Sequence, residues 1–280
     1  MPSDARSSRS GDYDRRVGTT ITVLSQKGGT GKTTTVRTLA DVLERIGLDV
    51  LCADLDPQGN LSDYFDVPAD ADPTVADVLV GKARAADAIH SGVLPANLGL
   101  AEAELVLSGK MGRELTLKRA LREIRKQYDL VLVDCPPALG LLTVNALVAA
   151  DYALISSEAE YFSLQGVEQA LEVIELAKES LHPELEWLGV LLNIVDMRFV
   201  HSREALKQLR ERFGDRVFDA VIRRSVRYAE SAERGVSILE YASDLGADYL
   251  ALADEVLARL GGFEEQRERL ASLRAELVPA

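Results

Sequence analysis

Residues 21–34 read I-T-V-L-S-Q-K-G-G-T-G-K-T-T. A short apolar and β-branched run, typical of a buried strand, leads into a glycine-rich turn. Apolar residues at helical spacing follow the turn. Glycines in such a turn let backbone N–H groups converge on an anion, and the positive end of the helix dipole adds to the attraction. The stretch therefore predicts a phosphate-binding loop between a strand and a helix.

The side chains of this loop are those that hold a nucleotide. Lys32 would reach the β- and γ-phosphates, and the hydroxyl of Thr33 would ligate Mg²⁺. The general form of the loop has Gly at the position of Gln26, whereas this chain has a second lysine, Lys27. We predict nucleotide contacts along the whole loop, from Lys27, Gly28, Gly29, Thr30, Gly31, Lys32, Thr33 and Thr34.

Strand-like runs and helical patterns alternate along the rest of the chain. Further apolar runs occupy residues 50–53, 130–133, 152–155 and 189–192. Helical patterns cover residues 36–46, 115–126, 163–180, 202–213 and 242–260. Runs that are apolar at successive positions suit strands buried on both faces of a parallel sheet. We predict an α/β fold, doubly wound, with a mostly parallel sheet flanked by helices.

Length and composition limit the class of protein. The 280 residues suffice for a core without disulfides or metal, and the two cysteines lie far apart in the sequence. This excludes a disulfide scaffold and a multi-cysteine zinc site, and it favours a reducing cytoplasm. No uncharged apolar stretch reaches the roughly 18 residues of a membrane span, and the first residues lack the apolar core of a secretory signal. We predict a disordered arm over residues 1–16, a single domain over 17–260 and a helical tail over 261–280.

Five segments resemble the ParA/MinD family of P-loop ATPases. Residues 27–34 (K-G-G-T-G-K-T-T) match its deviant Walker A motif, and residues 54–60 (D-L-D-P-Q-G-N) and 134–137 (D-C-P-P) resemble its two switch regions. Residues 161–166 (Y-F-S-L-Q-G) and 221–227 (V-I-R-R-S-V-R) resemble ParA/Soj-type partition ATPases. The resemblance covers residues 17–260 and implies the P-loop NTPase fold of the deviant Walker A class.

The resemblance implies hydrolysis of ATP to ADP and phosphate, with Mg²⁺ as cofactor. Asp56 would position or activate the attacking water, and Asp134 would hold Mg²⁺ together with Thr33. We expect Asp54 to brace the loop that carries Asp56. Together with the two loop lysines, Lys27 and Lys32, Asp56 forms the predicted catalytic set.

Lys27 is the most informative residue, because two ammonium groups in one phosphate nest would repel each other. The resemblance implies that Lys27 reaches the phosphates of a partner protomer in an ATP-bound homodimer. Elsewhere, an arginine finger supplied in trans in this way raises the rate about 10³–10⁵-fold. The alternative is a lysine that faces solvent at the shoulder of the loop.

Two further residues are expected at the base of the nucleotide. The resemblance implies that Asn193, at the end of a predicted strand, hydrogen-bonds the adenine, for which an amide side chain is suited. A capping or turn role is the alternative for Asn193. Arg223 stands where the family usually has Pro, and we predict that it contacts the base.

A basic stretch over residues 198–227 predicts a DNA surface. It contains nine Lys and Arg residues and four acidic ones, in a chain of net charge −13. A phosphate backbone responds mostly to charges within a Debye length of about 8 Å. The family resemblance implies nonspecific DNA binding here, which we assign to Arg198, Arg203, Arg224 and Arg227. A solvated arginine-rich face is the alternative.

These features predict a partition or positioning ATPase in the cytoplasm, associated with the nucleoid. Its partners would be a second copy of the chain, nonspecific DNA and a ParB-like or other cargo adaptor, with no membrane. A MinD-like membrane-cycling ATPase is the alternative within the family, disfavoured by the acidic tail. A P-loop metabolic ligase would need a second substrate pocket. A reductase that resembles the nitrogenase iron protein is disfavoured because Cys52 and Cys135 are poorly placed to hold a cluster.

Overall fold

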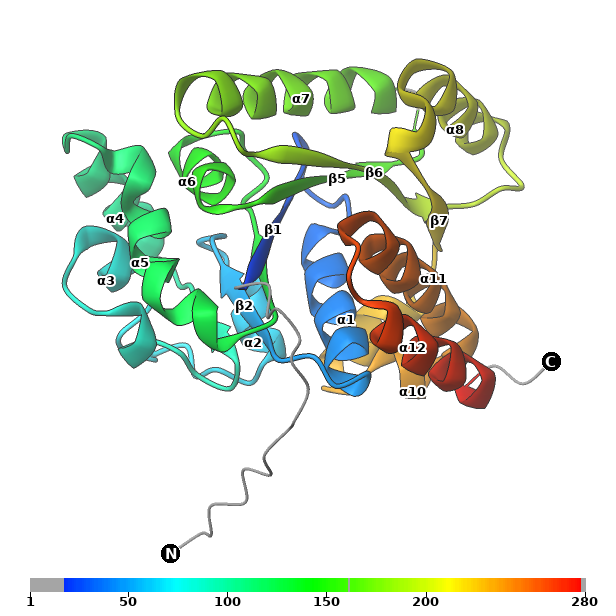
Figure 1. Ribbon diagram of the computed structural model, residues 1–280, viewed down its shortest axis with the longest axis horizontal. Helices are drawn as coiled ribbons and strands as arrows, with labels where there is room; N and C mark the ends of the chain where they lie inside the picture. The colour runs from blue at the N-terminus through cyan, green and yellow to red at the C-terminus, as the bar shows by residue number, and fades with distance from the viewer. Residues whose placement is uncertain (1–17, 161, 278–280) are drawn as a thin grey trace, which may run out of the picture.

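The computed structural model describes residues 18–160 and 162–277. Within them, seven strands form one sheet in the order β3-β2-β4-β1-β5-β6-β7, and every neighbouring pair is parallel (Figure 1). The strands are β1 (Thr19–Leu24), β2 (Val50–Asp54), β3 (Val93–Leu94), β4 (Leu130–Asp134), β5 (Tyr152–Glu158), β6 (Glu186–Val195) and β7 (Val217–Arg223). The predicted doubly wound α/β fold is confirmed.

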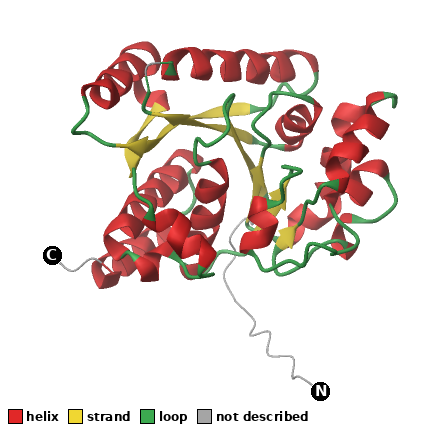
Figure 2. Cartoon of the chain, turned by 180° about the vertical axis from the view of Figure 1, so that it is seen from behind, coloured by secondary structure: helices red, strands yellow, loops and turns green. Residues whose placement is uncertain are grey.

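Helices cover both faces of the sheet (Figure 2). They are α1 (Lys32–Arg45), α2 (Asn60–Tyr64), α3 (Val75–Val80), α4 (Gly99–Ser108), α5 (Thr116–Ile124), α6 (Leu141–Ala149), α7 (Ser163–Ser180), α8 (Val200–Phe213), α9 (Arg227–Glu233), α10 (Ile238–Tyr241), α11 (Ser243–Leu260) and α12 (Glu264–Leu277). The apolar residues of α1, α11 and α12 belong to one core cluster, and those of α3 to α7 belong to the other.

Strand β4 explains why the apolar runs are continuous. Leu130 and Leu132 pack in the cluster on the α1 side, whereas Val131 and Val133 pack in the cluster on the α5 and α6 side. Successive side chains of a strand point to opposite faces, so a strand covered by helices on both sides buries every residue. The same pattern holds in β2, where all five residues are buried.

The elements at both edges of the sheet were not predicted from the sequence. Strand β3 has only two residues, too few to give a pattern. Strand β7 is exposed at Asp219 and Arg223, so its apolar run is interrupted, as is common for an edge strand. The short helices α2, α3 and α4 lie between β2 and α5, where no long helical pattern occurs in the sequence.

The C-terminal tail forms helix α12, which packs against the domain. Leu270 is buried, the guanidinium of Arg267 pairs with Asp254 of α11, and Arg269 donates to the carbonyl of Ile46. The predicted arm over residues 1–16 lies outside the described residues. Among the helices that the structure does describe, none is both long and apolar enough to cross a membrane.

The parallel sheet brings the predicted site residues to one edge. Strand β1 lies between β4 and β5, and the carboxyl ends of these strands and of β2 meet on the same side. In open α/β sheets, ligands bind in the crevice outside these strand ends, where the strand order reverses. The loops after β1, β2, β4 and β5 carry Lys27, Asp56, the residues after Asp134 and Glu160.

Candidate functional site

The glycine-rich loop after β1 depends on two glycines with positive φ. Gly29 has φ +79° and Gly31 has φ +80°, a conformation that costs other residues steric strain. A Cβ atom at Gly31 would also approach the side chain of Asn193 to 3.1 Å. The chain can therefore turn directly into α1, whose first residue is Lys32. Such a turn presents backbone N–H groups to an anion at the helix N-terminus.

Lys32 is folded back into the loop. Its side chain is largely buried, and the ammonium donates to the hydroxyl of Ser25 at 3.0 Å and to the carbonyl of Lys27 at 3.3 Å. Burial lowers the pKa of Lys32, and the nearby carboxylate of Asp134 opposes that shift. This is the position from which Lys32 can reach a phosphate held by the loop.

Thr33 and Asp134 form a site suited to a hard cation. The hydroxyl of Thr33 donates to Oδ2 of Asp134 at 2.6 Å, and Oδ1 of Asp134 is buried with no hydrogen-bond partner among the described residues. Burial raises the pKa of Asp134, and Asp54 on the adjacent strand adds to that shift. Mg²⁺ binds oxygen ligands and commonly uses one or two carboxylates. The unpartnered carboxylate oxygen beside a hydroxyl therefore fits the predicted Mg²⁺ ligands.

Asp54 braces the loop that carries Asp56, as predicted. The two carboxylate oxygens of Asp54 accept hydrogen bonds from the backbone of Asp56 and from the backbone and hydroxyl of Ser62 in α2. Burial raises the pKa of Asp54 to about 6. The carboxylate of Asp56 accepts from the backbone of Gln58 and is partly exposed, so it remains accessible at the edge of the site.

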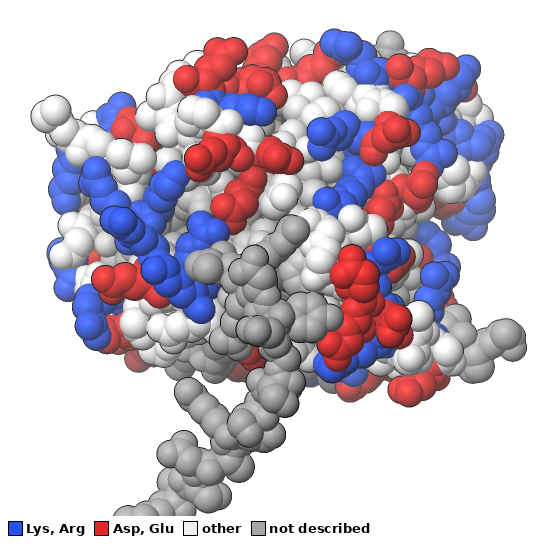
Figure 3. Space-filling view, in the orientation of Figure 1, with Lys and Arg blue, Asp and Glu red and all other residues white. Residues whose placement is uncertain are grey.

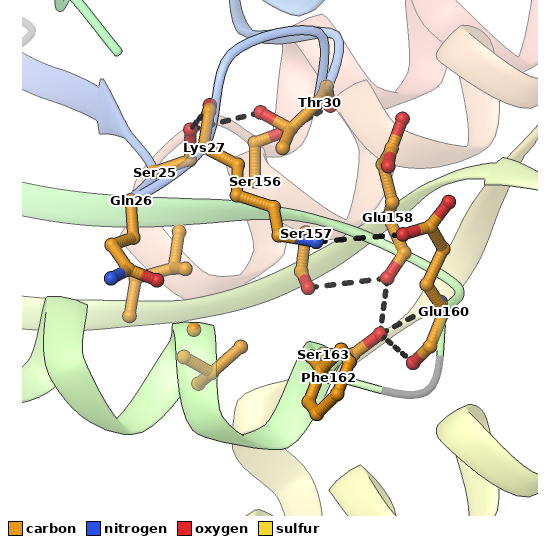
Figure 4. A pocket seen from close by; sticks show the side chains of 13 residues that line it. Ser25, Gln26, Lys27, Thr30, Ser156, Ser157, Glu158, Glu160, Phe162 and Ser163 are labelled. Atoms are coloured by element: carbon orange, nitrogen blue, oxygen red, sulfur yellow. Dashed lines mark hydrogen bonds and ion pairs between the residues drawn. The ribbon is translucent and has the colours of Figure 1, made fainter. Parts of the chain in front are cut away.

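Lys27 points away from its own loop. Its side chain is 50% exposed, and the ammonium lies 3.5 Å from the carboxylate of Glu160, in the turn between β5 and α7 (Figure 4). Ser163 holds this turn through hydrogen bonds with the backbone of Glu160 and Glu158. Glu160 directly precedes the ParA-like segment 161–166 and was not among the residues predicted from the sequence. An acidic residue beside that segment was the signal that could have identified it.

Asn193 lies beneath the loop rather than at an open surface. It is buried, and its amide nitrogen donates to Ser156 at 2.8 Å and to Thr35 at 3.3 Å. Both amide hydrogens are therefore used within the protein, and the side chain supports Gly31 from below. The predicted hydrogen bond between Asn193 and adenine stays a prediction.

Arg223 is also committed within the chain. Its backbone N–H and its guanidinium both donate to the carboxylate of Asp248 on α11 at 3.0 Å, and these bonds raise the pKa of Arg223. Both groups thus hold β7 against α11 in this structure, and the predicted contact of Arg223 with a base stays a prediction.

Four arginines are assigned to DNA. In the part of the chain that the structure describes, Arg224 is the only one of them whose own side chain forms no hydrogen bond or ion pair. Arg198 pairs with Asp196, Arg227 pairs with Asp244, and Arg203 donates to backbone carbonyls. On the right of Figure 3, over α8 and β7, basic and acidic side chains are accordingly mixed. Acidic residues from other elements therefore lie among the basic residues of this stretch, and its role in DNA binding stays a prediction.

Comparison with known proteins gives consistent results. A family model described as an AAA domain matches residues 18–187. Sporulation initiation inhibitor protein Soj of Bacillus subtilis is 40% identical over 86% of this chain and 99% of its own length. Chromosome partitioning protein ParA of Caulobacter vibrioides is 40% identical over 85% of this chain and 94% of its own.

Solved structures with the same fold contain nucleotide and magnesium. One is named cobyrinic acid a,c-diamide synthase from Mycobacterium smegmatis with bound ATP analog and magnesium. It has a TM-score of 0.71 and 36% identity, and covers 78% of this chain and 93% of its own. Another is the septum site-determining protein MinD of Pyrococcus horikoshii with Mg-ADP. It has a TM-score of 0.71 and 25% identity, and covers 87% of this chain and 98% of its own.

Proposed function

Because the chain belongs to the ParA/MinD family of P-loop ATPases, we propose that it is a partition or positioning ATPase that dimerises on ATP and then binds DNA nonspecifically. It hydrolyses ATP to ADP and phosphate with Mg²⁺ as cofactor. A ParB-like or other cargo adaptor stimulates hydrolysis. In this scheme the protein alternates between a dimer on the nucleoid and a free form in the cytoplasm.

The observation that carries this proposal is the opposite placement of the two loop lysines. Lys32 is enclosed by Ser25 and the backbone of Lys27, whereas the ammonium of Lys27 is half exposed and directed outward to Glu160. A lysine that faces outward beside a phosphate site can serve the phosphates of a second protomer. ATP then joins two copies of the chain, since each one completes the site of the other.

The residues of one protomer divide the chemistry between them. The loop N–H groups and Lys32 hold the phosphates, and Asp56 orients the attacking water in line with the γ-phosphate. Thr33 and Asp134 hold Mg²⁺, which neutralises charge on the β- and γ-phosphates when it is bound. Lys27 of the partner protomer stabilises the charge of the transition state. Asp54 keeps Asp56 in place through the bonds to Asp56 and Ser62.

The DNA surface is assigned to the stretch over residues 198–227. Arg224 has no ion-pair partner among the described residues, and the arginine side chains of the other two pairs, Arg198 and Arg227, are 87% and 45% exposed. Exposed ion pairs contribute about 0–1 kcal/mol, so a DNA phosphate can replace the carboxylate at small cost. Dimerisation places two such surfaces on one particle, and this supports a DNA affinity that depends on ATP. Binding should weaken steeply with salt.

Light scattering and DNA gel shifts with ATP, ADP and no nucleotide test this function together. We expect a dimer and a DNA complex with Mg-ATP only, and loss of both in Lys27→Ala. Lys126→Ala is the matched control, because Lys126 is an exposed lysine remote from the phosphate loop. ATP-dependent dimers in Lys27→Ala would contradict the role of Lys27. A dimer that never binds DNA would contradict the DNA part alone.

A second candidate function rests on the similarity to the structure named cobyrinic acid a,c-diamide synthase. A metabolic ligase needs a pocket for a second substrate beside the phosphates. The cavity beside the loop, lined by Lys27, Ser157 and Phe162 among others, has a volume of only about 30 Å³, roughly the room for one water. ATP turnover that requires an added small carboxylic acid, with no DNA binding, would favour this alternative.

The packing of α12 bears on the MinD-like alternative. A membrane-surface helix needs a free apolar face and a basic polar face. In α12 the buried Leu270 faces the domain, and Arg267 and Arg269 are used in contacts with Asp254 and Ile46. This supports a cycle on DNA rather than on a membrane. Sedimentation with anionic vesicles in the presence of ATP would reverse that preference.

A further inference from the structure

A groove on the β3 side of the molecule lies outside the nucleotide site. It has a volume of about 580 Å³ and lies between the end of α3, the segment after α4 and helix α5. Its lining includes Val78, Val80, Ala120 and Met111 as apolar groups and Lys110 and Arg119 as basic ones. We call it the α3–α5 groove. Figure 1 shows these three helices together at the left, far from α8 and β7.

The floor of the groove is apolar and its rim is basic. Small and branched apolar side chains from α3 and α5 form the floor, and Met111 at the edge is 99% exposed. A fully exposed methionine is an adaptable apolar contact for a partner. Glu123 is the only acidic residue among the described residues that line the groove.

The basic groups at this end of the molecule largely lack carboxylate partners. Arg84 pairs with Asp87, and Lys110 donates only to the carbonyl of Val80 at 3.0 Å. Within residues 18–160 and 162–277, no acidic side chain forms an ion pair with Lys82, Arg119 or Arg122. Figure 3 shows basic side chains over α5, at the left of the molecule. In a chain of net charge −13, this is a site of unsatisfied positive charge.

We propose that the α3–α5 groove binds an acidic amphipathic segment of a partner protein. The apolar face of the segment would lie on the floor, and its carboxylates would meet Lys110 and Arg119, as in helix-in-groove recognition. Nucleic acid fits the site less well, because the described lining offers no aromatic side chain for base stacking and its floor is apolar. The groove binds this segment whether or not the chain dimerises on ATP.

A buried asparagine joins the groove to helix α6. Asn145 of α6 accepts from the hydroxyl of Thr116, which lines the groove, and from the backbone of Leu117. Its amide nitrogen donates to the carbonyl of Arg113. Helix α6 follows the loop after Asp134, so a bound segment would contact the turn that anchors this helix. An effect on hydrolysis rests on the proposed function, whereas binding itself does not.

Fluorescence anisotropy with a labelled peptide tests the proposal on the full chain without nucleotide. The probe has about 16 residues, with leucines at i, i+3, i+4 and i+7 spacing on one helical face and glutamates on the other. We expect the charge reversal Lys110→Glu with Arg119→Glu to weaken binding at least about tenfold. The matched control is Arg122→Glu with Lys126→Glu, the same charge change on exposed residues that do not line the groove. It should weaken binding less than about threefold.

Two further measurements distinguish a specific groove from a basic surface that binds any polyanion. Met111→Ser, at a fully exposed position, should weaken the peptide severalfold with no change in the melting temperature. A scrambled peptide of the same composition should bind at least about fivefold more weakly, since it lacks the apolar face. The proposal is overturned if the peptide does not bind, or if both charge reversals weaken it equally. It is equally overturned if the scrambled peptide or a DNA duplex competes as well as the peptide does.

Discussion

Two regions at opposite ends of the sheet carry the same number of basic residues but differ in how far the fold neutralises them. Residues 198–227 and residues 82–126 each contain nine Lys and Arg, with four and five acidic residues, respectively. In the first region six of the nine form ion pairs, and four of those partners, Glu168, Asp196, Asp244 and Asp248, lie outside the stretch. Nine basic groups there face eight acidic ones.

In the second region three of the nine form ion pairs with described residues, and one of those partners, Asp151, comes from outside the region. Nine basic groups there face six acidic ones. Charge counted along a sequence window therefore makes the two surfaces look alike, although the fold neutralises the first one more completely. The proposed DNA surface must exchange ion pairs when it binds, whereas Lys110 and Arg119 of the α3–α5 groove form no ion pair with a carboxylate among the described residues.

The largest expected effect is a loss of DNA affinity when the first surface, but not the second, is altered. Arg224→Glu with Arg227→Glu should reduce DNA affinity in the presence of ATP at least about tenfold, because two phosphate contacts become repulsive. Arg122→Glu with Lys126→Glu, at the other end of the molecule, should change DNA affinity less than about twofold. Fluorescence anisotropy with a labelled duplex measures both. Equal losses would show that DNA responds to the overall charge and not to the assigned surface.

Removal of the neutralising carboxylates should raise the affinity of the first surface for DNA. Asp196→Asn with Asp244→Asn frees Arg198 and Arg227 from their ion pairs, so DNA affinity should rise about three- to fivefold and depend more steeply on salt. Glu265→Gln, which removes the partner of Arg269 on α12, is the control and should have no effect. An unchanged or lower affinity in the double variant would mean that these arginines do not meet phosphate.

A fall in pH from 7 to 5 should not reproduce the gain in DNA affinity expected from Asp196→Asn. The hydrogen bonds from Arg198 lower the pKa of Asp196 to about 2, so this carboxylate stays ionised at pH 5. The pKa of an aspartate in the unfolded chain is near 4. Because the pKa of Asp196 is lowered in the folded chain, the ion pair is fully present above pH 4 and is lost only as the pH falls through about 2. The ratio of DNA affinities between Asp196→Asn and the unaltered chain should therefore be the same at pH 7 and pH 5. A ratio that falls toward one at pH 5 would show that the pair has already opened there.

The smallest expected effect is on stability. Each of these two ion pairs has one well exposed member, with the side chain of Arg198 87% and that of Asp244 61% accessible, whereas that of Asp196 is only 13% accessible. The free energy of unfolding of Asp196→Asn with Asp244→Asn should therefore lie within about 1 kcal/mol of the unaltered chain. Denaturant titration measures this. A larger loss would show that these pairs hold α9 or α11 in place and are not freely exchangeable.

Those features that depend on local sequence were predictable. The strand-to-helix turn at residues 21–34 identified the phosphate loop because glycine conformation and strand burial are read from neighbouring residues. The pair Thr33 and Asp134, 101 residues apart, was expected as a magnesium site because their two motifs resemble those of a known family, and the structure places the two side chains 2.6 Å apart. The continuous apolar runs gave the central strands because helices cover both of their faces.

Features that depend on contacts between distant segments were not predictable. Glu160 meets Lys27 across 133 residues of sequence, and Asp248 meets Arg223 from a helix that follows later. Asn193 lies two residues before the end of β6, and its amide hydrogens are accepted by Ser156 of β5 and Thr35 of α1, which are distant in the sequence. A sequence window carries no information on which carboxylate or hydroxyl the fold brings to a given side chain.

The most direct test of the account mixes two inactive variants. Lys27→Ala keeps Asp56 but lacks the lysine for its partner, and Asp56→Ala keeps Lys27 but cannot orient water. If Lys27 acts across a dimer, a mixed dimer contains one complete site, so phosphate release from ATP should reappear when the two are combined. A mixture no more active than its components, although light scattering shows that mixed dimers form, would contradict the transfer of Lys27 between protomers.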